Sequence, residues 1–218
     1  MLEEFLTVIE SFIRNIGGRS GKKIRQLYYK GRLGRCGRNV IIEPGVFFQN
    51  PKFIFLGDNI WIDRYTILVA GPFSALNRKF IKKENSNYMG EGGQLMISDG
   101  THVAPFALLQ AHGGLSIGKN VTIAAGAKVY STSHHYKNLN DSSDHKRYSF
   151  STMAPAEDQF IISSPVVIGE NCAVGLNSVV LPGTTLRDGS WLGVLAHLDT
   201  SSSDEAAIYT SEPAHKNK

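Results

Sequence analysis

The sequence contains little cysteine and no long apolar run. The two cysteines, Cys36 and Cys172, are too few for a disulfide framework or a cysteine-based metal cluster, so we expect free thiols in a reducing compartment. No apolar stretch approaches the roughly 20 residues that a membrane span needs. The N-terminus, Met1-Leu2-Glu3-Glu4, is acidic where a secretory signal peptide is basic. Together these features predict a soluble, cytoplasmic protein.

Charge is scarce and unevenly placed. Charged residues make up 19% of the 218 residues and hydrophobic residues 42%, a composition that excludes disorder of the whole chain. Residues 14–38 hold nine cations and no acid, so the net charge of +4 comes from this segment. The rest of the chain lacks the basic surface that a nucleic-acid-binding domain requires, and we expect no nucleic-acid partner.

An aliphatic or aromatic residue recurs at every sixth position in five runs. Neither a helix nor a simple strand has that period, but a short strand followed by a tight turn does. Three such hexapeptides close one triangular coil, and the pattern predicts between five and six stacked coils. The seventeen residues expected to point into the coil are Ile42, Phe48, Leu56, Ile62, Leu68, Ile97, Val103, Leu109, Ile117, Ile123, Val129, Ile168, Val174, Val180, Leu186, Leu192 and Leu198.

Helical patterns precede the repeat. Apolar residues at helical spacing over residues 2–16, followed by two glycines, predict an amphipathic helix. A second, basic helix is expected at about 20–30. We therefore assign residues 1–38 to an N-terminal helical segment that lies outside the coils.

The coiled domain is assigned to residues 39–200, and residues 201–218 are expected to form a polar loop and tail. Within the domain the period is interrupted at 69–96 and again at 130–167. Excursions of this length are usually functional or disordered, and the second, of more than 30 residues, adjoins the candidate site described next.

Two histidines lie near the start of the second excursion. His134 is five residues past the inward Val129, at a corner of the coil, and His112 is three residues past Leu109. One coil with its bulge spans 20 residues, so we expect His112 beside Thr132, about one coil spacing from His134. Histidine suits general base catalysis because it titrates near neutral pH. The pair is therefore a candidate catalytic site.

The segments V-Y-S-T-S-H-H (129–135) and P-V-V-I-G-E-N-C-A-V-G (165–175) resemble the maltose, galactoside and nodulation-type sugar O-acetyltransferases of the hexapeptide-repeat superfamily. The resemblance covers about residues 40–215. It implies an all-β fold, the left-handed parallel β-helix of hexapeptide repeats, behind a short helical segment. It also implies transfer of acetyl from acetyl-CoA, as a co-substrate and without a metal, to a hydroxyl of a sugar or surface-polysaccharide precursor.

The resemblance assigns roles to individual residues. His134 matches the general base, whereas His112 stands where relatives commonly carry an aspartate. Ala104 replaces an acceptor-positioning asparagine, so the acceptor pocket differs from that of the small-sugar enzymes. Relatives are homotrimers with sites between subunits. The positions expected to contact the coenzyme are Gly175, Gly193, Val194, His215 and Lys218.

Several alternatives stay open. His135 is the base if the register is shifted by one residue. The same fold serves streptogramin-type xenobiotic O-acetyltransferases, amino-sugar N-acetyltransferases and non-catalytic scaffolds. It also serves γ-type carbonic anhydrases, whose His-x4-His zinc spacing does not occur around His134. The basic N-terminal segment and its amphipathic helix further suggest peripheral contact with the inner face of an anionic membrane.

Overall fold

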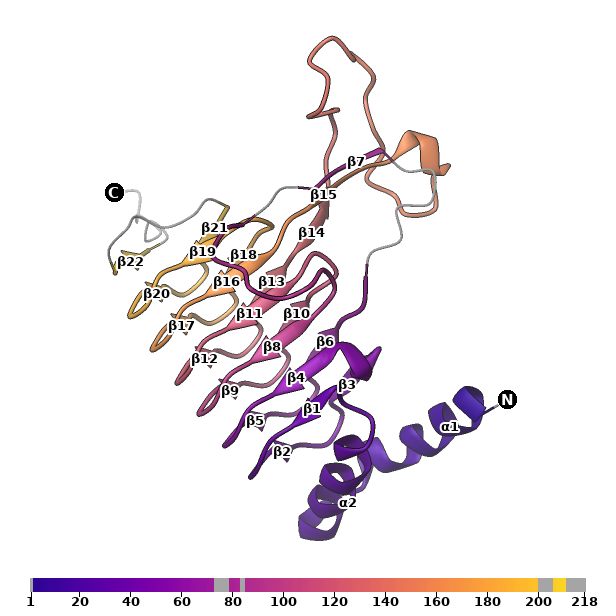
Figure 1. Ribbon diagram of the computed structural model, residues 1–218, viewed down its shortest axis with the longest axis vertical. Coiled ribbons are helices and arrows are strands. Elements are labelled where there is room, and N and C mark those ends of the chain that lie inside the picture. The colour runs from indigo at the N-terminus through magenta and orange to yellow at the C-terminus, as the bar shows by residue number, and fades with distance from the viewer. Residues whose placement is uncertain (1, 73–78, 83–84, 200–205, 211–218) are drawn as a thin grey trace, which may run out of the picture.

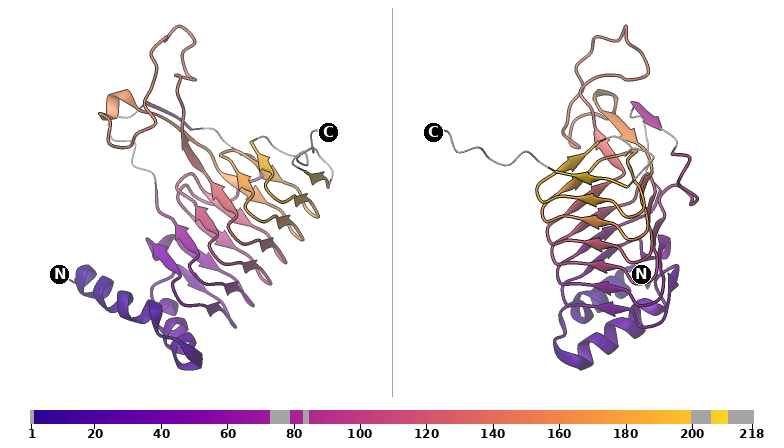
Figure 2. Two further views of the ribbon diagram at one scale, coloured as in Figure 1. Left: turned by 180° about the vertical axis from the view of Figure 1, so that it is seen from behind. Right: turned by 90° about the vertical axis from the view of Figure 1, so that its left-hand side faces the viewer.

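The computed structural model describes residues 2–72, 79–82, 85–199 and 206–210. They form a stack of triangular coils with two helices at its N-terminal end, and the second excursion projects from one side of the stack (Figure 1). Views from behind and from the side show the helices under the first coils and the last coils at the opposite end (Figure 2).

Each coil gives one short strand to each of three parallel sheets, called here faces 1, 2 and 3. Face 1 contains β1 (Arg35–Cys36), β4 (Ile54–Leu56), β8 (Leu95–Ile97), β11 (Leu115–Ile117), β16 (Val166–Ile168) and β19 (Thr185–Leu186). Face 2 contains β2 (Ile41–Ile42), β5 (Trp61–Ile62), β9 (His102–Val103), β12 (Thr122–Ile123), β17 (Ala173–Val174), β20 (Trp191–Leu192) and β22 (Ile208–Tyr209). Face 3 contains β3 (Phe47–Gln49), β6 (Ile67–Val69), β10 (Leu108–Gln110), β13 (Lys128–Tyr130), β18 (Val179–Val180) and β21 (His197–Leu198).

The core lies inside the prism. All seventeen residues that the period of six places inside are buried, the most exposed of them being Leu198 at 7%. They stack in register, as in face 3, where Leu109 pairs with Leu68 on one side and Val129 on the other. Burial of a continuous aliphatic column is the main stabilising contribution of such a stack.

The chain leaves the stack twice, each time after face 3. It departs after β6 and returns at β8, and it departs again after β13 and returns at β16. Two short 3₁₀ helices lie outside the strands, η1 (Pro51–Phe53) and η2 (Ala156–Asp158). The remaining strands, β7 (Lys79–Lys82), β14 (Thr132–His134) and β15 (Phe160–Ser163), belong to the excursions.

Helix α2 (Gly18–Lys30) lies against the first coil, whereas α1 (Leu2–Asn15) contacts α2 and reaches the coil at its C-terminal end, where Gly45 N donates to Arg14 O at 3.0 Å. Tyr29 of α2 is fully buried and packs against Phe48, with ring centroids 4.5 Å apart and the ring planes tilted by 53°. Arg25, also fully buried, donates from Nε to Ile42 O at 2.8 Å and from Nη1 to Ile16 O at 2.5 Å. The guanidinium therefore satisfies a carbonyl at the end of face 2. Neither helix is long and apolar enough to cross a bilayer.

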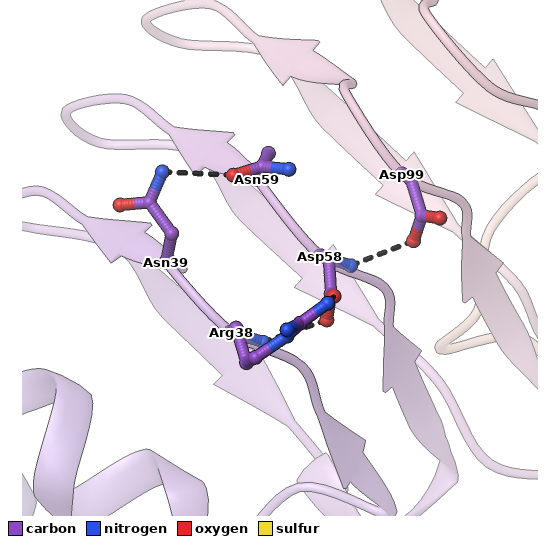
Figure 3. A network of polar contacts seen from close by, with 5 residues as sticks. All are labelled: Arg38, Asn39, Asp58, Asn59 and Asp99. Atoms are coloured by element: carbon purple, nitrogen blue, oxygen red, sulfur yellow. Dashed lines mark hydrogen bonds and ion pairs between the residues drawn. The ribbon is translucent and has the colours of Figure 1, made fainter.

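The corner between faces 1 and 2, called here the polar corner, turns through a residue with positive φ in every coil. These residues are Asn39, Asn59, Gly100, Asn120, Asn171 and Gly189. Asparagine and glycine are the residues that adopt this conformation most readily. Figure 3 shows side chains of adjacent coils joined there: Asn39 Nδ2 donates to Asn59 Oδ1 at 3.0 Å, and Asp99 Oδ1 accepts from Asp58 N at 2.7 Å.

The corner between faces 2 and 3, called here the apolar corner, makes the same turn with different residues. Its positive-φ positions are Gly45, Tyr65, Phe106, Gly126, Asn177 and Leu195. Tyr65 and Phe106 stack nearly parallel, with ring centroids 5.5 Å apart, and both rings are exposed. Bulky side chains at positive φ are strained, so this corner is the unusual one.

Candidate active site

The two excursions meet in a small sheet beside the stack. Strand β14 pairs antiparallel with β15, with His134 opposite Ile161, and β15 pairs parallel with β7 of the first excursion. The sequence places the excursions in separate intervals and carries no periodic signal for their pairing. Since β7 supports β15 and β15 supports β14, both excursions hold the strand that carries His134.

His134 is half-buried at the end of β14. Its Nε2 lies 3.4 Å from Oε1 of Gln159, a fully buried side chain on the returning half of the same excursion. Among the described residues, no hydrogen bond engages Nδ1 of His134. One ring nitrogen is thus held by the protein and the other is left for a ligand, as general base catalysis requires. Sequence reasoning missed Gln159, which lies 25 residues away in an aperiodic segment.

The His112 ring contacts the start of the first excursion. Its Nδ1 lies 2.9 Å from Gly71 O, at the start of the first excursion. The side chain that reaches Thr132 is Gln110, whose Nε2 donates to Thr132 Oγ1 at 2.5 Å. Oε1 of Gln110 also accepts from the backbone N–H groups of Ser131 and Thr132, at 3.1 and 2.9 Å. Gln110 therefore fixes the start of β14, and the role of His112 stays a prediction.

His135, the alternative base, contacts its own loop. Its backbone N–H donates to Phe160 O at 2.9 Å, and its Nδ1 lies 3.2 Å from Lys137 N. The ring also packs at 4.8 Å, centroid to centroid, against Tyr136. These contacts orient His135 along the loop and leave His134 as the stronger candidate base.

Gly175 and Gly193 lie where one coil closely approaches the next. A Cβ at Gly175 would stand 2.6 Å from Leu192 O, and one at Gly193 would stand 2.9 Å from Tyr209 O. Both backbone N–H groups already donate along the stack, Gly175 N to Leu192 O at 2.7 Å and Gly193 N to Tyr209 O at 2.6 Å. Coil stacking therefore accounts for both glycines, and neither amide hydrogen is available to a coenzyme within this arrangement.

Three further residues, Val194, His215 and Lys218, are expected to bind the coenzyme, and the structure describes only the first of them. Val194, 48% exposed, lies at the apolar corner. His215 and Lys218 fall outside the described residues. Within one chain, Gly175, Gly193 and Val194 all follow strands of face 2, whereas His134 follows face 3. One prism thus presents its candidate base and its candidate coenzyme residues at different corners.

The two cysteines are unsuited to covalent catalysis. Cys172 is buried and its Sγ donates to Arg187 O at 2.9 Å, while Cys36 is half-buried, and neither is in a disulfide. Burial raises the pKa of both thiols, which favours the protonated, poorly nucleophilic form. In the ranges that the structure describes, no three His, Cys, Asp or Glu side chains gather in a metal-binding group.

A pocket of about 470 Å³ lies in the tip of the second excursion, lined by residues between Lys137 and Arg147. Neither His134 nor His112 lines it. Asp144 within it accepts hydrogen bonds from Asn138 Nδ2 at 2.9 Å and from Tyr148 Oη at 2.6 Å. The pocket is therefore a feature of the loop and is separate from His134 and His112.

Known proteins share the repeat and the fold. Residues 165–193 match the family described as the hexapeptide repeat of succinyl-transferase. A dTDP-4-amino-4,6-dideoxy-D-glucose acyltransferase of Escherichia coli is 28% identical over 160 residues, which are 73% of this chain and 69% of that protein.

Two solved structures illustrate the likeness in fold. AntD, an N-acyltransferase from Bacillus cereus solved with dTDP and 3-hydroxybutyryl-CoA, has a TM-score of 0.62 at 19% identity, covering 89% of this chain and 87% of that one. A maltose O-acetyltransferase from Clostridium difficile 630 has a TM-score of 0.52 at 14% identity, covering 94% and 80%. With the three parallel faces, these likenesses confirm the predicted left-handed parallel β-helix.

Proposed function

We propose, on the premise that this chain is a hexapeptide-repeat protein of the acyltransferase superfamily, that it transfers an acyl group from a coenzyme A thioester to a sugar. In the form that we favour, the acyl group is acetyl and the acceptor is a hydroxyl of a sugar or surface-polysaccharide precursor. The observation that carries the proposal is His134, held on a short sheet beside the β-helix with Nδ1 unengaged among the described residues.

The chemistry follows from the weakness of the nucleophile. A sugar hydroxyl is scarcely ionised at pH 7, so a base must remove its proton as the oxygen attacks the thioester carbonyl. His134 takes this proton at Nδ1 and returns it to the sulfur of coenzyme A as the carbon–sulfur bond breaks. The products are the sugar ester and free coenzyme A, with no covalent intermediate on the protein.

We further propose that the working form is a homotrimer with sites between subunits. The stacked Tyr65 and Phe106 at the apolar corner are 53% and 64% exposed, and Leu195, farther along the same corner, is 67% exposed. Exposed apolar side chains of this kind are what protein interfaces bury. The separation of His134 from Gly175 and Val194 within one prism also favours this arrangement. A site that unites base and coenzyme then takes them from adjacent chains.

Transfer to an amino group is the second candidate function. It is favoured by the relative from Escherichia coli, whose name gives an amino sugar as acceptor, and by the AntD N-acyltransferase. The same base serves both reactions, because an ammonium group must also lose a proton before it attacks. A dTDP-linked 4-amino sugar, compared with its 4-hydroxyl counterpart, distinguishes the two candidates.

We also propose a cytoplasmic protein with peripheral contact to the inner membrane face. Phe12 of α1 and Leu27 of α2 are 74% and 65% exposed, and Arg19, Lys23 and Lys30 lie exposed on α2. Apolar side chains flanked by cations suit an anionic bilayer surface. Flotation with anionic vesicles tests this: the wild type should float, and Phe12→Ser with Leu27→Ser should not. Equal recovery of both contradicts it.

The decisive experiment for the function is acyl-CoA consumption across a panel of acceptors. Purified wild-type protein should release free coenzyme A thiol with acetyl-CoA and at least one sugar, nucleotide sugar or lipid-linked sugar. His134→Ala should lower the rate at least roughly 100-fold, the usual contribution of a general base. His145→Ala, in the loop pocket, is the matched control and should keep full activity. A His134→Ala protein that retains most of the rate refutes the assignment.

A further inference from the structure

Gln159 is a buried amide in an aperiodic part of the chain. It lies between η2 and β15 and is fully buried. Its Nε2 donates to Ala154 O at 2.5 Å and to Thr152 O at 3.3 Å, and its Oε1 lies 3.4 Å from His134 Nε2. Burying a polar side chain is costly unless its groups are bonded, so these contacts call for an explanation.

The two carbonyl partners fix which way the amide points. An amide NH₂ group has two hydrogens to donate, and Ala154 O and Thr152 O accept both. The reversed orientation would set the amide oxygen against two carbonyl oxygens, which repel it. The hydrogen-bond network therefore assigns Nε2 to the carbonyls and Oε1 to His134.

The orientation of Gln159 determines the tautomer of His134. The amide oxygen can only accept a hydrogen bond, so the ring nitrogen that faces it must carry the proton. Neutral His134 is then protonated at Nε2, and its lone pair lies on Nδ1. A histidine in the opposite tautomer would place two lone pairs face to face.

We infer that Gln159 is a positioning residue that holds His134 as the Nε2–H tautomer and thereby makes Nδ1 the basic nitrogen. The catalytic part of this inference rests on the proposed function, whereas the tautomer itself does not. The contact at 3.4 Å is long, and the physical expectation is that it shortens when the ring becomes an imidazolium, which is a better donor.

A neutral partner differs from a carboxylate in an informative way. A carboxylate in place of Gln159 would orient the ring equally well but would favour the imidazolium, which cannot act as a base. The amide orients the ring without adding charge. Among the described residues, the hydrogen-bond partners of the His134 ring include no acid.

The architecture explains how one residue can hold the base this firmly. Gln159 directly precedes β15, which pairs with β14 on one side and with β7 on the other. Ser164 N also donates to Ser131 O at 2.9 Å, which ties the returning end of the excursion to its start. The base and its positioning residue therefore belong to one hydrogen-bonded unit.

The test reads the tautomer directly by NMR. In wild-type protein labelled with ¹⁵N at histidine, two-dimensional spectra of the ring nitrogens above neutral pH should show His134 protonated at Nε2 and bare at Nδ1. His134→Asn identifies the signal. A predominantly Nδ1-protonated His134 in the wild type overturns the inference, and this measurement needs no folded variant of Gln159.

Two variants extend the test to catalysis. Gln159→Met, which keeps the length but not the acceptor, should give mixed tautomers and lower kcat at least roughly tenfold, with KM for acyl-CoA unchanged. Gln159→Glu should restore the tautomer and move the acid limb of the pH–rate profile to higher pH. Gln94→Met, outside this sheet, is the control and should change neither readout.

The outcomes separate the inference from the proposed function. An Nε2–H tautomer in a wild type that acylates no acceptor refutes the function and leaves the assignment of Gln159 to His134 standing. Active wild type together with an unchanged tautomer in Gln159→Met refutes the inference and leaves the function standing.

Discussion

The polar and apolar corners make the same turn with opposite chemistry. Both place one residue per coil at positive φ, and both repeat it six times along the described stack. At the polar corner, asparagine and glycine adopt that conformation at little cost, and side chains bond from coil to coil. At the apolar corner, Tyr65, Phe106 and Leu195 adopt it with exposed side chains.

The difference shows which corner is complete within one chain. Strain of about 1–2 kcal/mol accompanies each bulky side chain at positive φ, and within one prism the stacking of Tyr65 on Phe106 offsets only part of it. Strained residues persist where the surroundings or a function require them. The polar corner serves the fold of the single chain, whereas the apolar corner is explained if a second chain covers it.

The largest expected effect comes from placing charge at the apolar corner. Phe106→Asp should dissociate the proposed trimer and lower the proposed acyl transfer at least roughly 100-fold, because truncating a central aromatic anchor costs about 2–4 kcal/mol of association. Aspartate tolerates positive φ, so the coil itself should stay intact. Sedimentation velocity measures the oligomeric state, circular dichroism the integrity of the fold, and the coenzyme A release assay the acyl-transfer rate.

The control for this variant is a more exposed apolar residue elsewhere. Met89 in the first excursion is 90% exposed. Met89→Asp should leave the oligomeric state and the acyl-transfer rate unchanged. A trimeric, fully active Phe106→Asp protein would break the comparison, because the apolar corner would then need another explanation.

An intermediate effect is expected at the polar corner. Asn59→Ala should lower the free energy of unfolding by about 1–2 kcal/mol, since alanine is strained at φ 57° and the hydrogen bond with Asn39 is lost. Asn59→Gly loses only the hydrogen bond and should cost less than about 1 kcal/mol. Urea unfolding of both variants separates the two contributions, and equal losses would show that backbone strain is unimportant there.

The smallest effect concerns pH. Hydrogen bonds from the Arg38 backbone N–H and guanidinium, at 2.6–2.8 Å, hold the pKa of Asp58 below its usual range (Figure 3). Because the pKa of Asp58 is lower in the folded state than in the unfolded state, its ionised form stabilises the fold at pH values above the unfolded-state pKa of about 4. This stabilisation is lost as the pH falls through the folded-state pKa.

Calorimetry of the wild type and Asp58→Asn checks this difference. The wild type should have the higher Tm at pH 6, and the gap should narrow toward pH 3. Because Asp58 is at the surface, the shift should be only a degree or so. A Tm difference between the two proteins that does not change with pH would show that the charge of Asp58 does not contribute to stability. Phe106→Asp should not alter the Asp58-dependent gap, since the two corners share no partners.

The sequence predicts the stack well because the stack is periodic. The seventeen residues predicted from the repeat of six, from Ile42 to Leu198, are all buried, because a local period is read without knowing any distant contact. The period does not predict the core residues that lie outside it, such as Ile54 and Leu95. The two helices were also evident, with α2 beginning at Gly18 slightly before the expected start at about residue 20. Their apolar spacing and the glycines between them are likewise local signals.

The site is less predictable because it depends on contacts between aperiodic segments. The spacing predicts His112 beside Thr132, but it does not predict that the Gln110 side chain bonds to Thr132 or that His112 contacts Gly71 O. Gln159 and the pairing of β7 with β15 join residues far apart in the chain, where no repeat constrains the register. The strained Phe106 contradicts its local preference, so propensity alone argues against the turn that it makes.

The buried Arg25 and the helix that carries it have a consequence for self-association. Strands β1, β2 and β3 are the edge strands of the three faces. Uncovered, their free backbone groups could pair with a strand of another chain. Helix α2 lies against this end, and Arg25 occupies the carbonyl of Ile42 that a further strand would use. Helix α2 thus caps the N-terminal end of the stack. It covers the sheet edges through which two copies could otherwise join end to end into a fibre.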